Sequence, residues 1–154
     1  MPLAIRRARP DEAAALTALS FRSKRHWGYD DAFMAAALPD MQIAPDLLAC
    51  AIAVVAERGP ELLGFYILAA LPEGPTLRDL WVEPAAIGTG IGKRLWEHML
   101  VSARDEAFRT VRIVSDPNAA GFYAKMGARR AGEAASCVVP GRLLPVFEVD
   151  VSAR

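Results

Sequence analysis

The stretch that decides the fold is EPAAIGTGIGKRLW, residues 83–96. It places Gly88, Gly90 and Gly92 directly before a segment with helical periodicity. Each glycine costs chain entropy on folding, so three in five residues need a structural reason. At the start of a helix the usual reason is a phosphate held by backbone N–H groups. The stretch therefore raises the question of which phosphate the loop binds.

Two familiar phosphate-binding patterns do not fit this loop. The ATP-binding loop requires Gly at position 87 and Ser or Thr at position 94, where the chain has Ile87 and Arg94. The dinucleotide fingerprint, counted from Gly88, requires a third glycine where the chain has Lys93. That fingerprint also belongs to the first strand–helix turn of its fold, whereas this loop lies past the middle of the chain. A dinucleotide-dependent oxidoreductase is therefore disfavoured.

Composition and charge restrict the class of protein. The chain has 154 residues and 53% of them are hydrophobic, which suits one domain with one sizeable core spanning residues 1–154. Lys and Arg total 18, and so do Asp and Glu. Because a nucleic-acid-binding protein normally carries a basic excess, we expect no nucleic-acid partner.

Apolar runs and cysteines bear on location and metal binding. The N-terminus has no apolar segment of the signal-peptide kind, and the longest apolar run, near Leu47–Ala56, is about half of what a bilayer requires. Cys50 and Cys137 lack metal-ligand spacing, and so do the two histidines. We expect reduced thiols, no metal site, no membrane association and a cytoplasmic location.

Hydrophobic periodicity and turn residues predict alternating strands and helices. Strands are expected at residues 3–8, 51–57, 62–70, 76–82, 110–115, 128–140 and 143–151. Helices are expected at residues 10–20, 30–38, 90–106 and 117–126, with a short turn at 45–48. Asp30 would cap the second helix, and Pro39 would end it. A meander of strands followed by a β-α-β unit implies an α/β mixed sheet with helices on both faces.

Two motifs in the expected order carry a family resemblance. Val82 and Pro84 end a strand, and Gly90 and Gly92 follow at the spacing of the acetyl-CoA signature V-x-P, [RQ]-x-x-G-x-[GA]. Downstream, DPNAAGFYAKMGA, residues 116–128, matches N-x-x-A-x-x-[FL]-Y-x-[KR]-x-G-[FA]. Over about residues 10–149 the chain resembles the GNAT (GCN5-related) N-acetyltransferases. The resemblance implies a single GNAT-like domain whose mostly antiparallel sheet has a parallel, splayed pair at strands 4 and 5.

The resemblance also implies a cosubstrate, acetyl-CoA, and answers the question of the phosphate. The pyrophosphate of coenzyme A would lie at the N-terminus of the helix, where unpaired N–H groups and the helix dipole favour an anion. Backbone groups of strand 4 would bind the acetyl oxygen and the pantetheine amides. The implied cofactor-binding residues are Leu80, Trp81, Val82, Ile87, Gly88, Thr89, Gly90, Ile91, Gly92, Lys93, Asn118 and Phe122.

Two positions depart from the family pattern. Ile87 stands where the family has Arg or Gln, so the loop would rely more on its backbone N–H groups. Asp116 stands where the family has Asn at the end of the following strand. We expect Asn118, at the start of the next helix, to make part of that cofactor contact.

The family chemistry is direct attack of an amine on the thioester, without an acyl-enzyme. Tyr123 stands at the position of the family's general acid, and a phenol with a pKa near ~10 can protonate a thiolate of similar basicity. The general base is open: Asp79 and Glu57 are candidates by location, and proton loss to water is equally allowed. Cys137 has no His neighbour in sequence, and we interpret it as a small, partly buried strand residue.

The acceptor side is predicted from FRSKRHWGYDDAF, residues 21–33. Its candidate substrate-binding residues are Ser23, His26, Trp27 and Tyr29, a mixture of aromatic and hydrogen-bonding groups. The motif S-K-x-x-W-G-Y within it, and S-x-x-x-P-G-R-x-L-P at residues 136–145, resemble a bacterial GNAT subgroup with no substrate implied. His98 is interpreted as a surface residue. The expected acceptor is a small-molecule amine of unknown identity.

Two alternatives accompany this interpretation. The fold can also serve as an acyl-CoA-binding sensor without turnover, and Ile87 and the undefined base keep that function open. We further expect a homodimer, because the last strand, residues 143–151, is apolar on both faces, as a strand covered by a partner would be.

Overall fold

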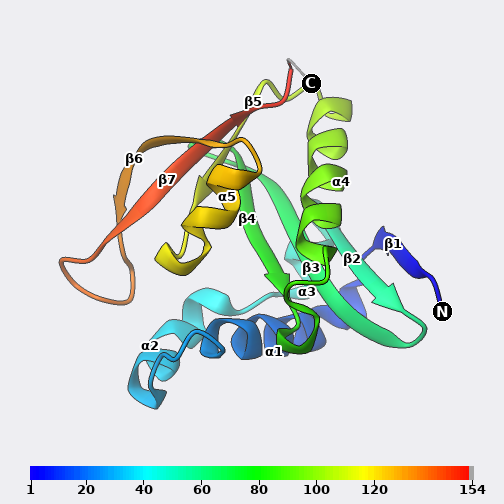
Figure 1. Cartoon of the computed structure of the whole chain (residues 1–154), viewed down its shortest axis with the longest axis horizontal. Helices are drawn as coiled ribbons and strands as arrows, with labels where there is room; N and C mark the ends of the chain where they lie inside the picture. The colour runs from blue at the N-terminus through cyan, green and yellow to red at the C-terminus, as the bar shows by residue number, and fades with distance from the viewer. Residues whose placement is uncertain (153–154) are drawn as a thin grey trace.

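The computed structural model describes residues 1–152 as one mixed sheet with helices on both faces, as predicted (Figure 1). The sheet has the strand order β1-β2-β3-β4-β5-β7-β6. Every neighbouring pair is antiparallel except β4 and β5. The strands are β1 (Leu3–Arg7), β2 (Ile52–Arg58), β3 (Glu61–Leu71), β4 (Gly74–Val82), β5 (Thr110–Val114), β6 (Arg129–Ala135) and β7 (Leu143–Asp150). The helices are α1 (Ala13–Arg25), α2 (Asp31–Met41), α3 (Pro45–Cys50), α4 (Ile91–Asp105) and α5 (Ala120–Lys125), with short 3-10 turns at Pro10–Glu12, Pro84–Ala86 and Pro117–Ala119.

Strand β3 shows why both faces of the sheet are covered. Successive side chains of a strand point to opposite faces. Tyr66 and Leu68 belong to the core beneath α4 and α5, whereas Phe65 and Ile67 belong to the core beneath α1 and α3. All four side chains are at most 1% exposed. A strand buried on both faces requires helices on both sides, as Figure 1 shows.

Two helix ends differ from the prediction. Helix α1 continues to Arg25 instead of ending near Ser20. Asp30 caps α2 as expected, since its carboxylate accepts from the Phe33 N–H at 2.8 Å, but the prediction that Pro39 ends this helix is wrong. Pro39 lies inside α2, which runs on to Met41, and Met41 packs into a small buried cluster with other α2 residues. Burial of Met41 outweighs the one backbone hydrogen bond that proline cannot make.

The sheet opens where the family resemblance places its splay. Ile67 pairs with Asp79 and Leu68 pairs with Leu77, so Arg78 is the extra residue of a β-bulge in β4. The parallel partner β5 is in register with β4 only at Thr76 and Arg112. Beyond this point the two strands diverge. The edge of β4 that follows the bulge therefore faces a gap in the sheet.

The last strand is covered by its own chain. Strand β7 lies between β5 and β6 and pairs with both. Val146, Phe147 and Val149 are buried at 6%, 5% and 1% exposure. These contacts explain the apolar character from which a homodimer was predicted. The homodimer stays a prediction, but the apolar last strand no longer supports it.

Two isolated residues are not where the sequence placed them. Cys137 is exposed and lies in the connection after β6, so the expectation of a partly buried strand residue is wrong. His98 is half-buried, and its Nδ1 lies 2.8 Å from the hydroxyl of the fully buried Tyr66, so it is not a plain surface residue. The shared hydroxyl, also 2.8 Å from Ser102 Oγ, ties α4 to β3.

Candidate functional site

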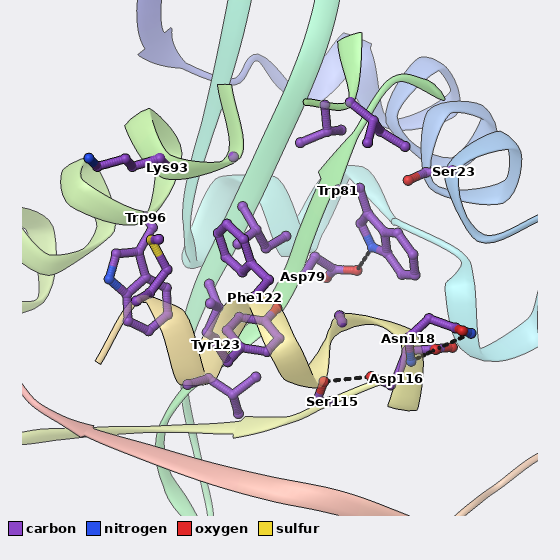
Figure 2. A pocket seen from close by; sticks show the side chains of 18 of the residues that line it. Ser23, Asp79, Trp81, Lys93, Trp96, Ser115, Asp116, Asn118, Phe122 and Tyr123 are labelled. Carbon is purple, nitrogen blue, oxygen red and sulfur yellow. Dashed lines mark hydrogen bonds between the residues drawn. The ribbon is translucent and has the colours of Figure 1, made fainter. Parts of the chain in front are cut away.

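One cavity of about 840 Å³ lies in the gap between β4 and β5 (Figure 2). Its wall combines the end of β4, the glycine loop, one side of α4, the end of β5 and α5. Ser23 and Trp27 of the α1 region complete it. The bulge and the divergence of the strands open this space, and the helices on either face enclose it.

The glycine loop has a backbone that other residues adopt only with strain. Gly88 has φ +84° and Gly90, which caps α4, has φ +88°. Both values lie in the left-handed region that glycine occupies without a steric penalty. A Cβ at either position would meet no protein atom within 4 Å. The glycines therefore set the loop conformation and leave open space next to it.

That open space faces a set of unused backbone donors. The first turn of α4 closes with the Arg94 N–H donating to the Gly90 carbonyl. Five backbone N–H groups of the loop and the first turn of α4 donate to no protein group within residues 1–152. They belong to Gly88, Gly90, Ile91, Gly92 and Lys93. These five unpaired N–H groups, at the positive end of a helix dipole, suit a pyrophosphate. The residues present thus fit coenzyme A at the predicted loop.

Asp79 is the buried acid of the cavity. It is 8% exposed, and its carboxylate accepts from the Trp81 indole Nε1 at 3.0 Å and from the Arg78 guanidinium. Burial raises the pKa of Asp79 above the ordinary carboxyl value, against the lowering effect of Arg78 and Trp81. Because it directly follows the bulged Arg78 in β4, the bulge decides that this carboxylate faces the cavity.

Tyr123 of α5 faces the same cavity. Its ring is 6% exposed and packs against Trp96, Phe122 and Phe147, with ring centroids 5.4 to 6.0 Å apart. Its hydroxyl makes no hydrogen bond within residues 1–152, and Figure 2 shows it on the side of the cavity where Asp79 lies. Burial and the nearby carboxylates of Asp79 and Asp116 raise the pKa of Tyr123 above its ordinary value near ~10. The phenol is therefore protonated at neutral pH and has a proton to donate.

Most of the predicted site residues meet in this cavity. Its wall includes Ser23, Trp27, Asp79, Leu80, Trp81, Val82, Ile87, Gly88, Gly90, Gly92, Lys93, Asn118, Phe122 and Tyr123. Thr89 is exposed, and its hydroxyl donates to the Ala86 carbonyl instead. Ile91 is 2% exposed and packs into the core, so only its backbone can serve the loop.

Besides Thr89 and Ile91, three predicted residues lie outside the cavity wall. His26 is exposed and contacts only the edge of Trp27 among aromatic rings. Tyr29 lies behind the wall, where its hydroxyl donates to Asp116 at 2.9 Å. Glu57 forms an ion pair with Arg6 at 2.9 Å and takes no part in the cavity wall, so the proposal of Glu57 as a base is wrong.

The sequence reasoning missed one charged pair at the predicted acceptor end of the cavity, where Ser23, Trp27 and Asp116 line the wall. Lys24 of α1 donates to Asp116, at the end of β5, at 2.8 Å, across 92 residues of chain. Burial opposes ionisation of Asp116, but hydrogen bonds from Lys24 and from the Asn118 N–H hold its pKa below the ordinary value. In the sequence, Asp116 stands out only as a departure from the family's Asn. A signal for Lys24 existed in the motif S-K-x-x-W-G-Y, but nothing in sequence connects it to Asp116.

Residues 1–152 contain neither a candidate membrane-spanning helix nor a candidate metal-binding cluster. None of the helices in residues 1–152 is long and apolar enough to cross a membrane. Within the same residues no three or more His, Cys, Asp and Glu side chains gather as a metal site would require.

Comparisons with known proteins give the fold and the family. The fold matches the PaiA N-acetyltransferase of Thermoplasma acidophilum in complex with coenzyme A, with TM-score 0.80, 14% identity and coverage of 97% of this chain and 99% of that one. A GCN5-related N-acetyltransferase of Rhodopseudomonas palustris gives TM-score 0.80, 20% identity and coverage of 97% and 96%. The yncA protein of Salmonella typhimurium, solved with its cofactor acetyl-CoA, gives TM-score 0.71, 17% identity and coverage of 98% and 95%.

A comparison with curated proteins finds no match. A family model, described as the acetyltransferase (GNAT) domain, matches residues 50–127, which is half of the chain and spans β2 to α5 with the glycine loop between them. The chain therefore belongs to the GNAT acetyltransferase family.

Proposed function

We propose that the protein is an acetyl-CoA-dependent N-acetyltransferase that acts on a small amine by direct attack on the thioester. One observation carries the proposal: a single cavity joins the orphan N–H groups of α4, the unpaired edge of β4, and the pair Asp79 and Tyr123. Relatives of the same fold were solved with coenzyme A or acetyl-CoA.

The chain's own groups have separable tasks. Acetyl-CoA supplies an acetyl group activated as a thioester. The α4 N–H groups hold the pyrophosphate, and the β4 backbone from Leu80 to Val82, which has no register partner on β5, binds the pantetheine arm and the acetyl oxygen. The orientation of the acetyl group is thus set by main-chain atoms that a side-chain substitution does not remove.

Two protons move as the new bond forms. When the N–C bond forms and the C–S bond breaks, the amine loses one proton and the leaving sulfur gains one. Tyr123 donates the second proton from its free hydroxyl. Asp79, or water in the cavity, accepts the first. The acceptor must arrive as the neutral amine, because an ammonium has no lone pair for attack.

The test measures thiol release from acetyl-CoA with a panel of amines, alongside calorimetric binding of coenzyme A. We expect micromolar coenzyme A binding and thiol release that depends on the amine. Cofactor binding without thiol release over the whole panel would refute the enzyme and favour the sensor function. Absence of coenzyme A binding by a folded protein would refute both.

A further inference from the structure

A hydrogen-bonded cluster centred on the Tyr29 hydroxyl lies behind the acceptor end of the cavity. This hydroxyl donates to Asp116 Oδ2 at 2.9 Å, and accepts from Asn118 Nδ2 at 3.2 Å and from Arg142 Nη2 at 3.0 Å. Lys24 donates to the same Asp116 oxygen at 2.8 Å. The two sequence motifs that the proposed function leaves unused, residues 23–29 and 136–145, therefore meet at one point.

The charges in this cluster do not cancel. Lys24 and Asp116 form a close pair whose side chains are 15% and 13% exposed. Tyr29 stays neutral, because burial raises the pKa of its hydroxyl. Arg142 is half-buried over the rings of Tyr29 and Phe33, at 5.6 and 5.7 Å from their centroids, and has no carboxylate within ion-pair distance in the described part of the chain. One positive charge is left over.

Arg142 also has donors to spare. Its guanidinium carries five N–H groups, of which the structure uses one, on Tyr29. No buried side-chain nitrogen or oxygen within residues 1–152 lacks a partner, so the Nε and Nη1 groups of Arg142, which make no hydrogen bond there, are not fully buried. A half-buried guanidinium that is fixed by stacking and one hydrogen bond is prepared to bind a planar anion with little loss of side-chain entropy.

Arg142 lies one hydrogen-bonded neighbour away from the cavity wall. Asp116 and Asn118 line the cavity, and the single Tyr29 hydroxyl separates each of them from Arg142. Ser23, Trp27 and Trp81 line the same end. Arg142 itself is outside the cavity wall, so the distal end of an acceptor reaches its guanidinium only if it extends past Asp116 and Asn118.

We propose that the acceptor amine also carries a carboxylate, and that Arg142 is the residue that selects it. This inference rests on the proposed function and names its substrate class: amino acids, with the amine toward Asp79 and the carboxylate toward Arg142. The uncompensated charge favours an anion over a second cation, so polyamines are disfavoured. A carboxylate matches the planar N–H fork.

The experiment compares matched pairs of acceptors. Glycine, β-alanine, γ-aminobutyrate and ε-aminocaproate are assayed by thiol release, each against its carboxamide, in the unmodified protein and in Arg142→Met. We expect the acids to have a KM about 10- to 100-fold below that of the amides, as a charge-assisted pair predicts. We expect Arg142→Met to abolish this difference while leaving the kcat for the amides within about twofold. The chain length with the lowest KM measures the span from the acetyl group to Arg142.

A matched control and two refuting outcomes complete the design. Arg130→Met removes another arginine, exposed on β6 and paired with Glu133, and should change neither acids nor amides. If the unmodified protein uses amides as well as acids, the inference is wrong. If Arg142→Met impairs acids and amides equally, Arg142 only supports Tyr29, and the inference is again wrong.

A binding measurement separates this inference from the proposed function. Calorimetry of the N-acetylated acids and N-acetylated amides with the protein saturated in coenzyme A needs no turnover. Arg142-dependent binding of the acids alone, without thiol release from any acceptor, would support the carboxylate site and refute the enzyme. Thiol release together with equal binding of acids and amides would support the enzyme and refute the carboxylate site.

Discussion

Replacing Tyr123 by Phe separates its chemical role from its packing role. The Tyr123 hydroxyl makes no hydrogen bond within the described chain, while the ring packs against Trp96, Phe122 and Phe147. Phe keeps that ring. The free energy of unfolding should therefore change by less than about 1 kcal/mol, and the affinity for coenzyme A should stay within a few-fold.

Turnover should respond quite differently. If Tyr123 protonates the leaving thiolate, Tyr123→Phe should lower kcat by roughly 10- to 1,000-fold, since water can partly replace the acid. This corresponds to about 1.4 to 4 kcal/mol in the activation barrier. Because the pKa of Tyr123 is raised above ~10, its protonation should produce no fall in kcat between pH 6 and 9 in the unmodified protein.

Tyr66→Phe is the matched control. Tyr66 is fully buried outside the cavity wall, and its hydroxyl is bonded to His98 and Ser102. Its loss should lower the free energy of unfolding by about 1–2 kcal/mol, because two polar groups lose a partner, and should leave kcat nearly unchanged.

The assays are thiol release under saturating substrates and thermal unfolding of each variant. Near-normal kcat in Tyr123→Phe, with the chemical step shown to be the slow one, would refute the acid role. It would leave Tyr123 as a core aromatic residue and strengthen the sensor alternative.

Three further predictions concern the base, the loop and the assembly. A base must be ionised, so activity of the unmodified protein should fall as the pH drops through the Asp79 pKa, which burial holds above the usual carboxyl value. Asp79→Asn should remove this acid limb of the pH–rate profile, and an unchanged limb would exclude Asp79 as the base. Gly90→Val should weaken coenzyme A binding at least about tenfold in calorimetry. Gly74→Val, at another glycine with positive φ but at the opposite end of β4 from the loop, should strain the backbone without affecting the cofactor, and equal losses in the two variants would contradict the loop assignment. Light scattering at micromolar concentration should give twice the chain mass of 16.6 kDa, and a single-chain mass would contradict the homodimer.

The sequence determined those features that depend on local order along the chain. Gly88, Gly90 and Gly92 predict a helix start that binds an anion. The sequence can predict it because a left-handed backbone and a following amphipathic helix are both local properties. Alternating strands and the β-α-β unit specified the mixed sheet. The end of α2 was missed for a non-local reason: burial of Met41 against other elements outweighs the local effect of Pro39.

Only the tertiary structure decided which charged groups share the site. Asp79 faces the cavity because a bulge at Arg78 shifts the alternation of β4, and periodicity alone does not reveal a bulge. Glu57 is ion-paired with Arg6, and Lys24 donates a hydrogen bond to Asp116 across 92 residues of chain. Arg142 forms no ion pair in the described chain, because its loop is packed against Tyr29, whose hydroxyl stands between the guanidinium and the Asp116 carboxylate. Ionic partners depend on distances of a few ångströms between segments far apart in sequence, and those distances exist only once the sheet and its helices are assembled.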